Sequence, residues 1–122
     1  MIPPVDFAGE VRSAVDEFAS GEIPGGQLRA QVAEMAQARA STQAVLYDTE
    51  KTEEWKATAR FEYECVYEVE LWEPHLERLR EVDQQFADVL QLHLKNLRAM
   101  AAEFTRRTRA AEHAPGGAPP SP

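Results

Sequence analysis

The chain has 122 residues, with 13 basic and 21 acidic side chains and a formal net charge of -8 at pH 7. That length suits one domain with one modest core, and the acidic balance disfavours nonspecific binding to nucleic acid or to an anionic membrane. Because no signal-peptide pattern opens the sequence and no apolar run approaches the ~20 residues of a membrane span, we expect a soluble, cytoplasmic protein.

The first predicted structure is a short helical hairpin over residues 5 to about 47. Asp6 can cap its first helix, because a short acidic side chain accepts hydrogen bonds from the first backbone N–H groups of a helix. The apolar residues that follow keep helical spacing: Phe7, Val11, Val15 and Phe18. Two adjacent glycines after Pro24 mark the turn. A second apolar stripe then begins with Leu28, Val32 and Met35.

Residues 55–71 fit two kinds of secondary structure. Apolar side chains fall on odd numbers and polar ones mostly on even numbers, which is the period of a strand. However, no glycine occurs between Gly26 and Gly116, as is typical of a helical run. A hairpin turning near residue 51 would also pair this segment with alanine-rich residues that fit a helix better. We therefore favour a mainly α fold over the alternative, an α+β fold with a β-hairpin at about 44–71.

A heptad stripe runs through the C-terminal half and predicts one long helical region. Core-type positions recur every four and then three residues: Cys65, Val69, Trp72, Leu76, Leu79, Asp83, Phe86, Leu90, His93, Leu97, Met100 and Phe104. Pro74 either starts a helix or kinks one, and both alternatives leave residues 75 to about 111 helical. Further apolar residues widen the stripe toward a bundle of three or more helices: Val82, Ala87, Val89, Leu94 and Ala101.

The length of this stripe predicts self-association. At 1.5 Å per residue the stripe spans roughly 60 Å, which is more than residues 5–47 can cover. We therefore expect a homo-oligomer whose interface is formed by the stripe positions from Trp72 to Phe104.

The polar and reactive residues of the stripe have structural roles in our interpretation. Cys65 is the only cysteine, which excludes an internal disulfide, and its place in the stripe predicts a buried thiol. Asp83 fits a register-setting polar residue or a local bend, and His93 fits a hydrogen-bonded structural or interface histidine. Neither Glu-x-x-His nor His-Glu-x-x-His occurs in the sequence. We predict no catalytic, metal-binding or cofactor-binding residues, and therefore no enzyme.

An acidic, aromatic segment offers a candidate contact for a protein partner. Its predicted partner-binding residues are Glu62, Tyr63, Glu64, Tyr67, Glu68, Glu70, Trp72 and Glu73. Such a run is usually only a solvated face. Its glutamates nevertheless suit a basic protein surface, and its aromatic rings are of the residue types that anchor interfaces. We expect most of these glutamates to face solvent.

The C-terminal end of the long helix carries Arg106, Arg107 and Arg109, whose charge suits the negative end of the helix dipole. The tail 114–122 is rich in Pro and Gly and is predicted to be disordered, which leaves residues 1–113 as a single helical domain. We expect a non-enzymatic, self-associating helical scaffold, adaptor or chaperone that binds a protein partner. The alternative is a small regulatory protein that contacts nucleic acid through these arginines or mimics it with the acidic segment.

Overall fold

The computed structural model describes residues 5–112 of the chain. Helices make up 85% of these residues, and no strand occurs among them. The predicted mainly α fold is confirmed, and the alternative β-hairpin at about 44–71 is wrong. The predicted disordered tail, residues 114–122, lies outside the described residues.

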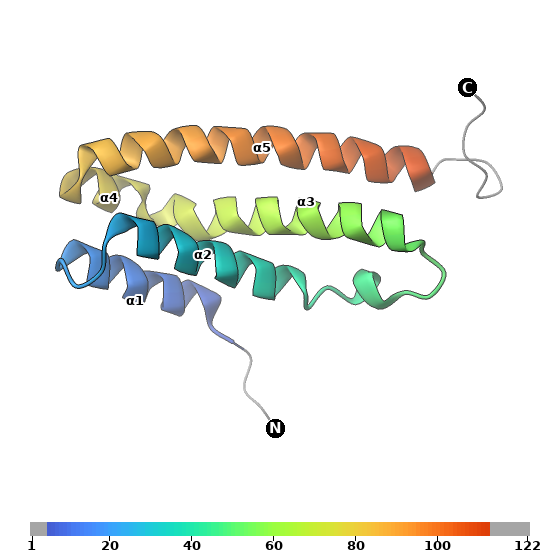
Figure 1. The fold of residues 1–122 in the computed structure, drawn as a ribbon, viewed down its shortest axis with the longest axis horizontal. Coiled ribbons are helices and arrows are strands. Elements are labelled where there is room, and N and C mark those ends of the chain that lie inside the picture. The colour runs from blue at the N-terminus through green and yellow to red at the C-terminus, as the bar shows by residue number, and fades with distance from the viewer. Residues whose placement is uncertain (1–4, 113–122) are drawn as a thin grey trace.

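The N-terminal helical hairpin is confirmed and consists of α1 (Phe7–Ala19) and α2 (Gly25–Ala40). The carboxylate of Asp6 accepts a hydrogen bond from the backbone N–H of Gly9 at 2.9 Å, as expected for the cap of α1. Gly21 has a φ of 82° in the turn, a conformation that side chains with a Cβ rarely adopt. The turn therefore depends on glycine, and it lays α2 back along α1 (Figure 1).

The ambiguous segment forms α3 (Glu53–Trp72), which follows the short 3-10 helix η1 (Ala44–Tyr47). The hydroxyl of Thr52 caps α3 by accepting a hydrogen bond from the backbone N–H of Trp55 at 3.0 Å. Figure 1 shows α3 lying between α2 and α5 (Gln84–Glu112), and it packs most extensively against these two helices. A helix contacted on two sides carries apolar residues around much of its circumference. This explains the strand-like alternation of its sequence.

The predicted long C-terminal helix is confirmed, but the helical region from residue 75 is interrupted at Asp83, where the chain reverses. Pro74 lies in the 3-10 helix η2 (Glu73–His75), and α4 (Leu76–Val82) follows. Asp83 then leaves helical geometry, with φ -155° and ψ 98°, and its carboxylate accepts a hydrogen bond from the backbone N–H of Phe86 at 3.0 Å. Asp83 is thus a local bend that caps α5, and α5 runs back along α3 (Figure 1).

All the long helices meet around the ring of Phe86 at the start of α5. This ring packs against Phe18 of α1, with ring centroids 4.7 Å apart, and against Trp72 of α3 at 6.4 Å. A Cβ on Gly25 would lie 2.8 Å from the Phe86 ring, so the start of α2 needs a glycine for this close approach. Other large side chains are fully buried around them: Val11, Val15, Leu28, Val32, Leu79, Leu90 and Leu94.

Candidate interaction surface

The stripe predicted to form an oligomer interface is largely covered within the single chain. Its apolar residues are mostly buried or half-buried: Trp72, Leu76, Leu79, Phe86, Leu90, Leu97 and Phe104. Asp83 and Met100 are exposed. The reversal at Asp83 folds α5 against α3, so the premise that the stripe outruns its partners in the same chain is wrong. Self-association itself stays a prediction.

A hydrogen-bonded cluster between α3 and α5 contains the one charged side chain that is buried among the described residues. Glu68 is only 9% exposed, and its Oε2 atom accepts a hydrogen bond from the indole N–H of the fully buried Trp72 at 3.2 Å. The same oxygen lies 2.7 Å from Nε2 of His93. This is the hydrogen-bonded structural role predicted for His93, and it satisfies polar groups that would otherwise be costly to bury.

Cys65 lies one helical turn before Glu68 and is buried, as predicted. Burial raises the pKa of the Cys65 thiol, and the negative charges of Glu68 and Glu64 raise that pKa further. A thiol with a raised pKa forms little thiolate and is a weak nucleophile. The described residues also contain no group of three or more His, Cys, Asp or Glu side chains that could hold a metal ion.

The acidic residues predicted to bind a partner are distributed around α3 rather than gathered on one face. Glu62 accepts a hydrogen bond from Thr105 of α5, and Glu73 pairs with Arg98 of α5 at 2.9 Å. On another side, Glu70 pairs with Arg39 of α2 at 3.3 Å. Glu64 pairs with Arg60 of α3 itself at 3.4 Å.

The aromatic members of that predicted surface are also engaged within the chain. Trp72 is fully buried, and Tyr63 and Tyr67 stack on each other with ring centroids 5.9 Å apart. The guanidinium of Arg39 lies 4.1 Å from the centre of the Tyr67 ring. The expectation that most of the segment's glutamates face solvent is wrong, because only Glu70 and Glu73 are exposed. The segment therefore does not present its residues as one surface.

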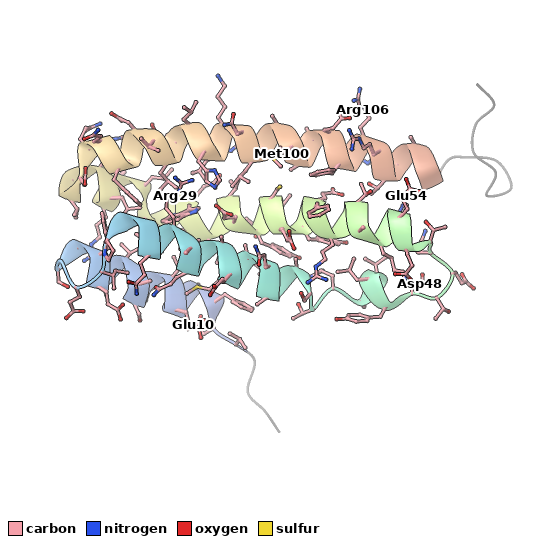
Figure 2. The ribbon with its side chains drawn as sticks, in the orientation of Figure 1. Glu10, Arg29, Asp48, Glu54, Met100 and Arg106 are labelled. Carbon is pink, nitrogen blue, oxygen red and sulfur yellow. The ribbon has the colours of Figure 1, made fainter. Side chains whose placement is uncertain are left out.

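The arginines at the end of α5 have acidic and aromatic neighbours on the same helix. Arg106 and Arg107 both pair with Glu103, and the Arg107 guanidinium lies 5.8 Å from the centre of the Phe104 ring. Figure 2 shows Arg106 projecting away from α3, in agreement with its 75% exposed side chain.

A different surface, on α5, carries exposed apolar side chains, of which only Met100 belongs to the predicted oligomer interface. Val89, Leu92 and Met100 are 52%, 61% and 48% exposed, and Asn96 between them is also exposed. At 100° per residue these positions fall within about 80° around the helix axis. We call these four residues the α5 strip; Met100 is labelled in Figure 2.

Beyond Met100, toward the C-terminal end of α5, the exposed apolar surface continues onto α3. Phe61 of α3 is 53% exposed, and its ring stacks on the ring of Phe104 with centroids 5.8 Å apart. A sequence signal for this surface did exist, because Val89, Leu92 and Asn96 are spaced by three and four residues. This signal was overlooked because Val89 was grouped with Leu94 and Ala101 as a residue that widens the buried stripe. Leu94 and Ala101 are buried, whereas Val89 is exposed.

Comparison of the chain with protein-family models, with curated proteins and with solved structures gave no match. Within residues 5–112, no helix is both long enough and apolar enough to span a bilayer.

Proposed function

We propose that this protein is a non-enzymatic helical scaffold that self-associates and acts through protein–protein contact. The observation that carries the proposal is the α5 strip together with the neighbouring Phe61–Phe104 pair. Single exposed apolar residues are normal on a soluble protein, but an aligned set is typical of a contact surface. From Val89 to Phe104 this set extends for about 22 Å along α5.

The chemistry of the strip also suits a contact between proteins. Methionine and phenylalanine are enriched in interface cores, and charged residues are depleted there. None of the four strip residues is charged, and Lys95 and Arg98 lie elsewhere on α5. Glu103 continues the same face beyond Met100 and pairs with Arg106 and Arg107. Asn96, the only asparagine of the chain, offers an amide that can pair with a partner in the middle of the apolar contact.

The groups with catalytic potential support the non-enzymatic part of the proposal, because they already have structural partners. Glu68 is bonded to Trp72 and His93, and the Cys65 thiol is buried with a raised pKa.

Sedimentation equilibrium from about 5 to 500 µM tests self-association. We expect a mass above the 13.7 kDa of one chain that rises with concentration. Leu92→Glu and Met100→Glu should each weaken association at least tenfold, because each would bring a charge into the apolar contact. Gln91→Glu is the matched control: Gln91 is exposed on α5, about 100° or more around the axis from the strip, and its variant should associate like the wild type. A wild-type mass of 13.7 kDa at every concentration would refute the proposal.

A further inference from the structure

We infer that the α5 strip binds the same strip of a second copy of this chain, with the two α5 helices antiparallel and Asn96 of each copy at the two-fold axis. This inference rests on the proposed self-association and adds the face, the direction and the register. It follows from where the apolar, amide and charged side chains lie along α5.

The register follows from the position of the single polar residue in the strip. Leu92 and Met100 lie four residues before and after Asn96, so an antiparallel pair centred there places Leu92 against Met100 of the second copy. Val89 then lies opposite Glu103 of the second copy, whose carboxylate pairs with Arg106 and Arg107 of its own helix. A slip by one helical turn would place the Asn96 amide against an apolar side chain and leave it without a hydrogen-bond partner. The centred register avoids this, because the two Asn96 amides can bond each other.

The direction follows from the charges at the two ends of α5. Asp83 and Asp88 lie near its start, whereas Arg106, Arg107 and Arg109 lie near its end. Asp88, Arg106 and Arg107 are exposed and lie on or beside the strip face, where an adjacent helix can meet them, whereas Asp83 and Arg109 lie about 100° or more around the axis from it. An antiparallel pair brings Asp88 of one copy close to Arg106 of the other, since the two lie on the same side of the strip and at nearly the same height, within the ~8 Å over which charges act at physiological salt. A parallel pair would place the arginines of one copy against the same arginines of the other, and this repulsion disfavours it.

Disulfide trapping tests face, direction and register together. The variants Leu92→Cys, Met100→Cys and Asn96→Cys would each be made in the full chain with Cys65→Ser, which removes the native thiol. A disulfide needs Cα atoms about 4.4–6.8 Å apart. In the inferred pair, positions 92 and 100 of opposite copies meet, whereas the two 92 positions are displaced by about 12 Å along the axis. Gln91→Cys is the control on the same helix.

Under mild oxidation, we expect Asn96→Cys to form a disulfide dimer with itself. An equimolar mixture of the Leu92→Cys and Met100→Cys variants should give mixed dimers at least fivefold faster than either variant alone or Gln91→Cys, as read from intact masses. If Leu92→Cys instead links to itself fastest, the helices are parallel and the inference is overturned. If sedimentation shows association but no strip variant links faster than Gln91→Cys, another face forms the contact, which overturns this inference and leaves the proposed scaffold standing. A monomeric wild type would overturn both.

Discussion

Glu68 shows at the scale of single residues why this helical bundle tolerates a carboxylate in its interior. The side chain lies between α3 and α5, and both of its polar neighbours, Trp72 and His93, bond the same oxygen. Among the described residues, no buried side-chain nitrogen or oxygen lacks a hydrogen-bond partner. The cluster therefore joins two helices without leaving a polar group unsatisfied.

Glu68→Ala should lower the free energy of unfolding by about 1–3 kcal/mol, because it leaves the buried indole N–H of Trp72 without an acceptor. Urea unfolding followed by circular dichroism would measure the change. Glu70→Ala is the matched control on the same helix: its ion pair with Arg39 is exposed to solvent, so its loss should cost less than about 1 kcal/mol. Equal losses in the two variants would contradict the structural role of Glu68.

His75 gives the molecule a pH-dependent contribution to stability. Partial burial lowers the pKa of His75 below 6.5, Arg12 and Arg78 lower it further, and Asp16 acts in the opposite direction. The unfolded chain therefore takes up the proton more readily than the folded one. The sign follows: stability is unaffected by this group above pH 6.5 and falls as the pH drops from 6.5 to the lower folded-state pKa.

We accordingly expect the melting temperature to fall between pH 7.5 and pH 5.5, and to fall less in the variant His75→Gln, which cannot take up this proton. Thermal denaturation of both proteins at the two pH values is the measurement. Since Arg78 also pairs with Asp16, an Arg78→Ala variant would not separate the two effects, and the histidine is the residue to change. If the melting temperature of His75→Gln falls as much between the two pH values as that of the wild type, other groups cause the pH dependence.

At the scale of the elements, the sequence identifies helices better than it identifies their ends. The α1–α2 hairpin was predictable because Gly21 and the glycine pair after Pro24 stop one helix and start the next. A local bend was one of two roles predicted for Asp83, but the reversal of the chain there was not predicted, because no glycine or proline stands at this point and the aspartate coincides with a position of the heptad stripe. Aspartate is also a common N-cap residue, and here it caps α5. The helix before it, α4, ends without a glycine or proline to signal its end.

The start of α2 offers a matched pair of substitutions that tests the packing around Phe86. Gly25→Ala should cost about 1–3 kcal/mol, because the new Cβ would lie 2.8 Å from the Phe86 ring and would have to displace it. Gly26→Ala meets no atom within 4 Å and should be neutral or stabilising by up to about 1 kcal/mol, since alanine favours the helix. The denaturant midpoints of the two variants measure both changes in stability. If both variants lose stability equally, the Phe86 contact does not explain the glycine at position 25.

At the scale of the whole molecule, periodicity predicted which residues are buried but not what covers them. The heptad stripe correctly marked Trp72, Leu79, Leu90 and Leu97 as core residues, yet the covering surface comes from the same chain. The acidic segment likewise showed its charge in the sequence, but the partners of Glu62, Glu70 and Glu73 are set by α2 and α5. The α5 strip depends on which side of that helix stays uncovered, which a single sequence does not reveal.

The up-and-down arrangement also has a consequence for how rapidly the chain finds its structure. Each long helix packs chiefly on its neighbour in the chain: α1 on α2, α2 on α3, and α3 on α5 through the short α4 connection. Contacts of small sequence separation require only short loops to close, and domains of this kind fold in microseconds to milliseconds. We expect refolding in rapid-mixing experiments to be complete within milliseconds. The reversal at Asp83 therefore brings together the two halves of the apolar stripe before a second chain meets either of them.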